Sequence, residues 1–292
     1  MRGARSSRAL AAALLALGIA GRPLCAQVVD SAQARRDSVI LHRQIFPRTD
    51  AWLLLGFTAG VIAARPLDRE LTQRLQRPGV QANRVLSGGA DVFRVYAFPG
   101  AAVVGGGFYV AGLARHDRTM ADVALHGMES IVVTGVLVDV VKGVAGRARP
   151  LVDPENPHDY ELFRGFRSSD SFKSFPSGHT AAAFAIASAM TAEATDKRPK
   201  IRRLVAITTY TAAGFTGLSR MYNNKHWASD VMAGAAFGTL TGMTVVRFNH
   251  RHPHNLLDRT FLPKRAPDLH AASAMVLPTS EGWAVGLMMP TS

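Results

Sequence analysis

The sequence predicts an all-α protein: a helical bundle of about six core helices, followed by a short C-terminal β-hairpin. Three observations support this fold class. The apolar segments are rich in Ala, Gly, Leu and Val and have lengths that favour helix over strand. Charged or proline-containing breaks separate them. No fixed-period repeat or low-complexity tract divides the chain. The six segments lie at about residues 51–64, 97–113, 123–141, 180–195, 204–218 and 227–248.

Residues 1–26 have the pattern of a secretory signal peptide. Arginines precede an apolar run at 10–20, and small residues around Ala26 suit cleavage there. Cys25 also raises the alternative of a lipoprotein signal, which Arg22 disfavours because such a signal requires an aliphatic residue at that place. We therefore expect an exported protein with a polar N-terminal arm at 27–50 and a helical domain at 51–250.

The chain of 292 residues has a formal net charge of +13, which indicates acidic partners such as phosphates, anionic lipid headgroups or nucleic acid. The basic residues are scattered between apolar segments and form no basic helix or aromatic-interleaved stripe, which argues against nucleic acid. The expected partners are a phosphorylated substrate and an anionic membrane surface. The one cysteine lies within the predicted signal, so we expect no disulfide in the mature chain.

The pattern leaves open whether the helices span a membrane. A span needs about 20 apolar residues, and several segments are shorter. Glu129 and Asp139 also lie inside the third segment. If the signal were cleaved and every segment spanned, the loop before His179 would lie on the cytoplasmic side. The sequence slightly favours an exported bundle that is soluble or membrane-associated, with its site facing the periplasm.

The C-terminal tail at 251–292 changes character. Two apolar stretches flank Pro278-Thr279-Ser280-Glu281-Gly282, a pattern typical of a β-hairpin with a glycine-containing turn. A strand pair packed on the bundle is the favoured interpretation, and contact with a partner is the alternative.

The first of three chemistry-bearing patterns is Lys142-x6-Arg149-Pro150. Lysine supplies a point charge, whereas arginine supplies a planar fork that can bind two phosphate oxygens. Pro150 stops the helical run. Alone, the pair is also typical of a solvated helix end.

The second pattern is Pro176-Ser177-Gly178-His179, immediately before a strong helix-forming run. Ser177 suits an N-cap, and Gly178 lets the backbone approach a ligand closely. Backbone N–H groups at that helix start form an anion site. His179 would stand at its mouth and could protonate a leaving oxygen. The alternative is a helix cap followed by a surface histidine.

The third pattern is Ser219-Arg220-x5-His226-x3-Asp230. His226 and Asp230 are four residues apart and share one helical face. We expect the carboxylate to hold Nδ1–H of His226 and to leave Nε2 free to attack phosphorus. A structural His–Asp pair is the alternative for this pattern alone.

Taken together, the three patterns are specific. Each four-residue pattern is expected by chance on the order of 0.002 times in a chain of this length. Their combination resembles the type 2 phosphatidic acid phosphatase superfamily, which includes bacterial acid phosphatases and vanadium haloperoxidases. The resemblance covers residues 142–230 tightly and implies an all-α bundle. It also implies phosphate binding by Lys142, Arg149, Ser177, Gly178 and Arg220, with His226 as nucleophile, Asp230 as its orienter and His179 as general acid.

The resemblance implies a phosphatase that hydrolyses lipid phosphates, lipid pyrophosphates or soluble phosphomonoesters through a phosphohistidine, with no cofactor and no metal. Vanadate is then expected as an inhibitor. The alternatives are a haloperoxidase that uses vanadate as a prosthetic group, and a lipid-headgroup binder without catalysis. The sequence does not choose among phosphatidate, polyprenyl pyrophosphate, lipid A phosphate and soluble esters.

Two further histidine groups suggest metal binding. Asp122, His126 and Glu129 share one helical face, and a buried polar network is favoured over a metal there. His250, His252 and His254 alternate in a segment that we expect to be a solvated basic loop.

Overall fold

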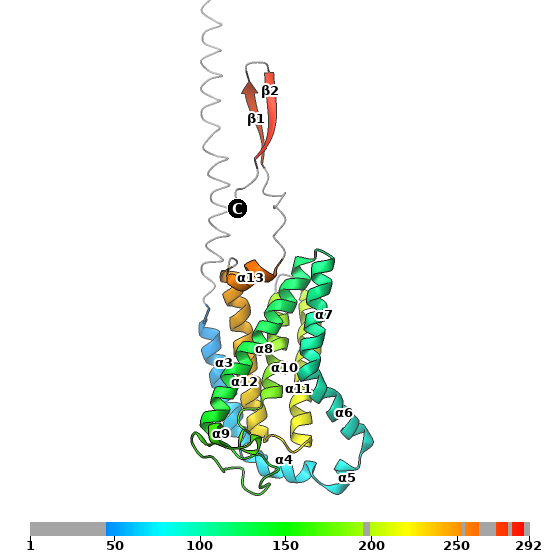
Figure 1. Ribbon diagram of the computed structural model, residues 1–292, viewed down its shortest axis with the longest axis vertical. Coiled ribbons are helices and arrows are strands. Elements are labelled where there is room, and N and C mark those ends of the chain that lie inside the picture. The colour runs from blue at the N-terminus through cyan, green and yellow to red at the C-terminus, as the bar shows by residue number, and fades with distance from the viewer. Residues whose placement is uncertain (1–44, 195–198, 253–254, 263–272, 280–281, 289–292) are drawn as a thin grey trace, which may run out of the picture. The chain divides into compact units, whose positions relative to one another are not determined.

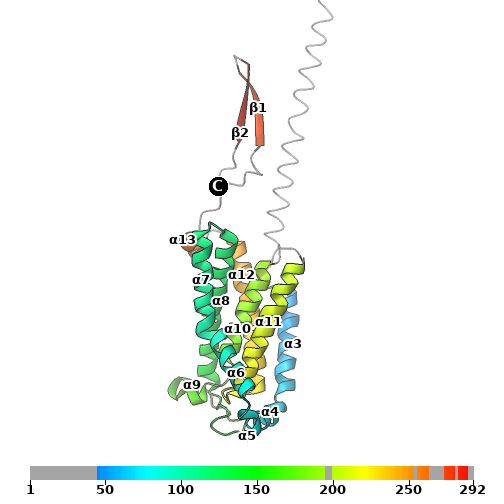
Figure 2. The ribbon, with the colours of Figure 1, turned by 90° about the vertical axis from the view of Figure 1, so that its right-hand side faces the viewer.

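The computed structural model describes residues 45–194, 199–252, 255–262, 273–279 and 282–288. Within these ranges, long helices lie side by side as a bundle (Figures 1 and 2). The long helices are α3 (Arg48–Ala64), α7 (Ala101–Ala114), α8 (Arg118–Ala145), α10 (Gly178–Glu193), α11 (Pro199–Tyr222) and α12 (Ala228–Arg251). They match the six predicted segments, so the predicted helical fold class is confirmed.

Shorter elements connect the long helices. They are α4 (Leu67–Leu75), α5 (Pro78–Gln81), α6 (Arg84–Val95), the π-helical turn η1 (Tyr96–Gly100), α9 (Arg164–Arg167), the 3₁₀ turn η2 (Asp170–Phe172) and α13 (Leu256–Phe261). Helices α4, α5 and α6 were not among the predicted elements. Their residues mix apolar and charged side chains without a long apolar run, so no apolar pattern marks them. Helices α4, α5 and α9 gather at one end of the bundle, and α13 lies at the other (Figure 1).

Two strands, β1 (Ser273–Thr279) and β2 (Gly282–Met288), lie in the C-terminal tail. They pair antiparallel with each other, with Ser273 opposite Met288 and Thr279 opposite Gly282. The predicted signal peptide and most of the predicted N-terminal arm lie outside the described residues, so those two assignments stay predictions.

Helix α10 lies at the centre of the bundle and packs against α8, α11 and α12. Its buried face is lined by alanines, among them Ala181, Ala185 and Ala189. Facing them, α12 presents Gly234, Gly238 and Gly242 at a spacing of four residues, on one helical face. A Cβ on Gly234 would lie 2.5 Å from the carbonyl oxygen of Ser177. Small residues on both helices therefore let the two backbones approach closely.

Within the part of the chain that the structure describes, two helices are long and apolar enough to cross a membrane: α8 and α12, with α3 and α4 together as a bent third candidate. Both helices extend beyond the apolar runs from which they were predicted. Polar residues such as Arg118 and Lys142 continue α8 past residues 123–141, and α12 continues past residue 248. The outward face of α8 exposes Val132, Val136 and Val140. An apolar face of this kind suits lipid. Of the two forms that the sequence left open, soluble or membrane-associated, these helices support association with a membrane.

The close approach of α10 and α12 predicts that Gly238 tolerates no side chain. A Cβ there would collide with the carbonyl oxygen of Ala181 and the amide nitrogen of Ala185, backbone atoms that cannot rotate away. Gly238→Ala should lower the stability by about 2 kcal/mol, and the Tm by about 5 °C.

The matched control is Gly214→Ala in α11, where an added Cβ meets no atom within 4 Å. Because alanine is the better helix former, this change should leave the Tm unchanged or raise it slightly. Equal thermal unfolding curves for the two variants would contradict the close-packing argument.

Candidate active site

The structure brings all three sequence patterns to one end of the bundle, the end that carries α4, α5 and α9 (Figure 1). Helices α8 and α11 end there, and α10 and α12 begin there. The residues predicted to act on phosphate therefore sit in the terminal turns of four helices or in the loops between them. They are Lys142, Arg149, Ser177, Gly178, His179, Arg220, His226 and Asp230.

His226 lies in the loop before α12 and is almost fully buried. Its Nδ1 atom is 2.7 Å from the carbonyl oxygen of Ser174 and 3.7 Å from Oδ2 of Asp230. The shorter distance is a hydrogen bond and the longer one is not. Nδ1–H therefore donates to the carbonyl, which fixes the tautomer and leaves Nε2 unprotonated. Burial lowers the pKa of His226 to about 4, so the ring is neutral at neutral pH.

Asp230 lies close to His226, as expected, but the shortest contact of Nδ1 is with the carbonyl of Ser174, and other donors already occupy the carboxylate. Oδ2 accepts from the hydroxyl of Ser174 at 2.6 Å and from the backbone N–H of Trp227 at 2.9 Å. Oδ1 accepts from Nη1 of Arg147 at 2.5 Å. Asp230 thus also acts on His226 indirectly, because it positions both Ser174 and the start of α12.

Arg147 is the buried centre of this network. It joins Asp230 to Asp68 of α4, whose Oδ2 lies 2.7 Å from Nη2. The hydroxyl of Ser229 accepts from Nη1 at 2.8 Å, and the carbonyl of Pro157 accepts from Nη2 at 2.7 Å. The guanidinium also lies over the ring of Tyr160. One cation therefore compensates two buried carboxylates and ties α4, the loop after α8 and α12 together.

Two arginines of the three patterns are buried, and each has an N–H donor that bonds to no acceptor within the described residues. Within the described residues, Nε of Arg149 and Nε of Arg220 have no hydrogen-bond partner, although both atoms are buried. Arg149 does reach Asp170 through Nη2, at 2.9 Å. A buried N–H without an acceptor is costly, and an oxyanion bound between these arginines would satisfy both.

Lys142 approaches the start of α10. A Cβ on Gly178 would lie 3.0 Å from Nζ of Lys142, so a side chain at this position would crowd the ammonium group. The first N–H groups of α10 have no acceptor inside the helix. Gly178 therefore brings a lysine charge and a helix start together, as the sequence predicted for an anion site.

His179 lies in the first turn of α10. Its pKa is lowered to about 4, first by burial and then, in decreasing order of effect, by the neighbouring Arg220, His226, Lys142 and Arg149. These four neighbours of His179 come from the first and third patterns. The side chains of all three patterns therefore lie close together. An anion bound among these charges would raise the pKa of His179 again.

Ser177 occupies the N-cap position of α10, as expected, but its side chain makes no capping hydrogen bond. Its hydroxyl pairs with that of Thr180 at 2.9 Å, and its N–H donates to the backbone carbonyl of Asp230 at 3.0 Å. Ser177 therefore joins the starts of α10 and α12.

Three residues of the site were missed by the sequence analysis: Ser174, Arg147 and Asp68. Arg147 lies between the two cations of the first pattern, and its spacing alone does not distinguish it from a solvated arginine. Its burial, with 1% of its surface exposed, depends on Asp68, which lies 79 residues earlier. Ser174 contributes a backbone carbonyl, an acceptor that every residue type carries.

Comparison with known proteins identifies the region that contains this site. Residues 124–253 match the PAP2 superfamily, and this range contains every predicted site residue. The resemblance predicted from the three patterns is thereby confirmed.

Curated relatives match over shorter stretches. The lipid A 1-phosphatase of Porphyromonas gingivalis is 51% identical over 87 residues, which cover 30% of this chain and 19% of that protein. The lipid A 1-phosphatase of Rhizobium johnstonii is 35% identical over 113 residues, or 37% of this chain and 41% of that protein. The matched regions thus span less than half of each relative.

Among solved structures, the fold is similar to that of the first transmembrane PAP2 type phosphatidylglycerolphosphate phosphatase from Bacillus subtilis. The TM-score is 0.49 at 21% identity, and the match covers 68% of this chain and 95% of that one.

The buried network predicts that Arg147 is needed for stability. Arg147→Met should leave Asp68 and Asp230 as adjacent buried carboxylates without a cation, at a cost of about 3–5 kcal/mol. The measurement is thermal unfolding of the purified protein. Arg167→Met is the matched control, because the side chain of Arg167 is 70% exposed. If both variants unfold at the same temperature as the original protein, the network does not contribute to the stability of the fold.

Proposed function

Because residues 124–253 match the PAP2 superfamily, we propose that the protein is a membrane-bound phosphatase that hydrolyses phosphorylated lipids through a phosphohistidine on His226. The single observation that carries this proposal is the state of His226. Its ring is buried and neutral, and its Nδ1–H is committed to the carbonyl of Ser174. An unprotonated Nε2 beside buried cations is what a nucleophile toward phosphorus requires.

The proposed reaction has two steps. In the first, Nε2 of His226 attacks phosphorus, the bond from phosphorus to the ester oxygen breaks, and His179 donates a proton to that leaving oxygen. In the second, His179 takes a proton from a water molecule as the water attacks the phosphohistidine. Inorganic phosphate leaves, and both histidines return to their starting state.

The cations supply charge stabilisation throughout. Lys142, Arg149 and Arg220 neutralise the equatorial oxygens, on which negative charge accumulates in the transition state. The unpartnered Nε donors of the two arginines suit this role, because they are already oriented and need no further desolvation when the phosphoryl group binds.

Two observations support a lipid as the substrate. A largely apolar groove of about 460 Å³ lies along the end of α8, close to the phosphate residues in sequence. Val141 of this groove immediately precedes Lys142, and Phe175 precedes Pro176. The named activities of the relatives, lipid A 1-phosphatase among them, agree with a phosphate ester of a lipid. The groove lining is Val140, Val141, Val144, Ala145, Tyr160, Leu162 and Phe175.

We propose that the protein is exported and embedded in a membrane, with its site facing the periplasm. The signal-like N-terminus and the basic charge of the chain support this location. Phosphatidate, lipid A phosphate and polyprenyl pyrophosphate are the substrates to compare, with a soluble phosphomonoester as reference.

His226→Ala should abolish turnover of phosphatidate and of lipid A phosphate, because no other group replaces the nucleophile. Rapid acid-free quenching with ³²P-labelled substrate should trap an acid-labile, base-stable phosphoprotein in the original protein and none in the variant. The control is His252→Ala, at the opposite end of α12. Near-normal hydrolysis by His226→Ala would rule out the proposed mechanism.

The pH dependence of kcat/KM follows from the two histidines. His226 must be neutral, and its pKa of about 4 predicts that activity falls below that pH. His179, with its pKa also at about 4, carries no proton in the empty site at higher pH. The proton for the leaving group must then arrive with a monoanionic substrate, whose second pKa is about 6.

We therefore expect kcat/KM to be highest between about pH 4 and 6 and to fall above it. His179→Ala should lose most activity with poor leaving groups and least with p-nitrophenyl phosphate, because a good leaving group needs little protonation. A profile that stays flat to pH 9 in the original protein would contradict this assignment of the proton.

A further inference from the structure

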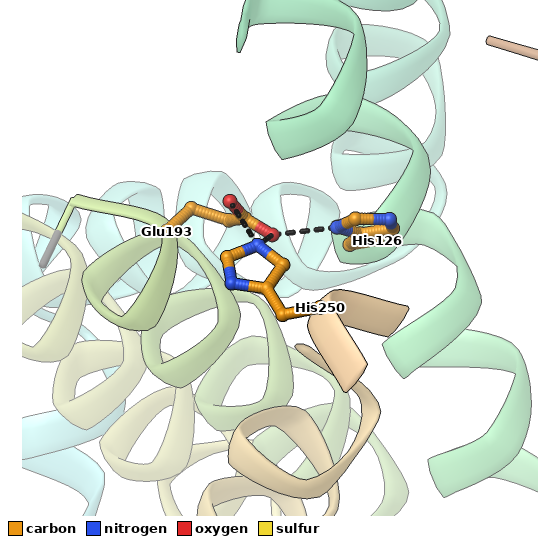
Figure 3. Close-up of side chains that lie close together, drawn as sticks. All are labelled: His126, Glu193 and His250. Carbon is orange, nitrogen blue, oxygen red and sulfur yellow. Dashed lines mark hydrogen bonds and ion pairs between the residues drawn. The ribbon is translucent and has the colours of Figure 1, made fainter. Parts of the chain in front are cut away.

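A second cluster of polar side chains lies at the other end of the same helices. Helix α8 carries His126 about 24 Å from Lys142 along its axis, and α10 carries Glu193 about 21 Å from His179. His250 lies in the last turn of α12. Figure 3 shows the two imidazoles converging on the carboxylate of Glu193 from separate helices. The phosphatase mechanism uses none of these residues.

The three side chains are in direct contact. Nδ1 of His126 lies 2.5 Å from Oε1 of Glu193, and Nε2 of His250 lies 3.1 Å from each oxygen of the same carboxylate. One ligand atom from each residue can be chosen so that all lie within 4.8 Å of one another. The side chains of His126 and Glu193 are almost fully buried, whereas that of His250 is 37% exposed.

This donor set has the chemistry of a zinc site. Two imidazole nitrogens and one carboxylate oxygen are ligands that Zn²⁺ binds at about 2.0–2.2 Å. In a tetrahedral site such ligand atoms lie roughly 3.3–3.6 Å apart. The present ligand atoms include a pair at 2.5 Å and all lie within 4.8 Å of one another, so metal binding requires side-chain shifts of about 1 Å. The exposed side of His250 gives solvent access and room for water as the fourth ligand.

A fourth residue holds His126 in the orientation that a metal needs. Oδ1 of Asp258, on α13, lies 3.3 Å from Nε2 of His126, and Asp258 is itself buried. A carboxylate that accepts the far N–H of a histidine fixes its tautomer and turns the other nitrogen toward the metal. Here that other nitrogen is Nδ1, the atom that faces Glu193.

Charge balance also suits a divalent cation. Two carboxylates, Glu193 and Asp258, lie beside His126 with side chains that are almost fully buried. One Zn²⁺ bound to neutral imidazoles would compensate their negative charge.

The first of the two histidine groups that the sequence suggested does not form a site of its own, and His254 of the second group lies outside the described residues. Glu129 instead accepts from Nδ2 of Asn249 at 2.5 Å, and Asp122 lies 3.6 Å from Nε of Arg118. One histidine from each group meets Glu193, a residue that neither pattern contained.

We propose that His126, Glu193 and His250 bind one Zn²⁺ ion, or a divalent transition metal of similar ligand preference, and that Asp258 positions His126. The ion joins α8, α10 and α12 at the end of the bundle away from the phosphate site. This function is separate from hydrolysis, and its tests do not use phosphatase activity.

The test uses the full-length protein in detergent, free of any polyhistidine tag and stripped with a chelator. Added Zn²⁺ should bind saturably at one ion per chain and release protons to the buffer. It should also raise the Tm by on the order of 5 °C at a hundredfold excess over Kd. Zinc-edge X-ray absorption should show two imidazole ligands.

Matched variants locate the ion. His250→Asn should remove saturable binding and the Tm shift, and because His250 is partly exposed this variant should still fold. His252→Asn, two residues away, should bind as the original protein does. Asp258→Asn should weaken binding about tenfold or more through His126.

The proposal fails if Zn²⁺ leaves the Tm unchanged, or if His250→Asn and His252→Asn bind it equally. It also fails if absorption spectra show a single imidazole or none. Loss of phosphatase activity in His226→Ala would bear only on the proposed mechanism, so the two ideas fail independently.

Discussion

The buried bridge from Asp68 through Arg147 to Asp230 is the interaction on which the site depends. A guanidinium in the interior is expensive to desolvate, and it is tolerated only when hydrogen bonds satisfy its N–H groups. Arg147 meets that condition with two carboxylates, a hydroxyl and a carbonyl. Because Asp230 in turn holds the hydroxyl of Ser174, the loop that bears the acceptor of His226 is fixed by the same bridge.

Close helix packing gives that bridge a rigid frame. The glycines of α12 lie against the backbone of α10, and Gly234 touches the carbonyl of Ser177 itself. Any displacement of one helix start would therefore move the other. The phosphate residues at one end and the His–Glu cluster at the other are carried on the same helices, so the distance between them is set by backbone geometry and not by loops.

Much of this arrangement could be predicted from the sequence. The apolar runs gave the long helices, and the three patterns gave residues that converge at one end of the bundle. The length of α8 was underestimated because polar residues such as Arg118 and Lys142 continue the helix past both ends of its apolar stretch. The partner of His226 could not be predicted, because His226 and Asp230 have the right spacing for contact, yet Ser174, Trp227 and Arg147 already occupy that carboxylate. This competition among donors for the carboxylate of Asp230 involves residues distant in the sequence, so the spacing of His226 and Asp230 cannot predict it.

The group that orients His226 most closely is the backbone carbonyl of Ser174. A main-chain oxygen carries no formal charge and persists whatever side chain evolution places there. It holds the imidazole in one tautomer without drawing the ring toward the imidazolium form, as a directly bonded carboxylate would. A neutral group thus orients the ring, whereas Arg147 and Asp230 compensate each other's buried charge. Because Asp230 also holds Ser174, the two tasks meet at one carboxylate, and a substitution of Asp230 would affect both.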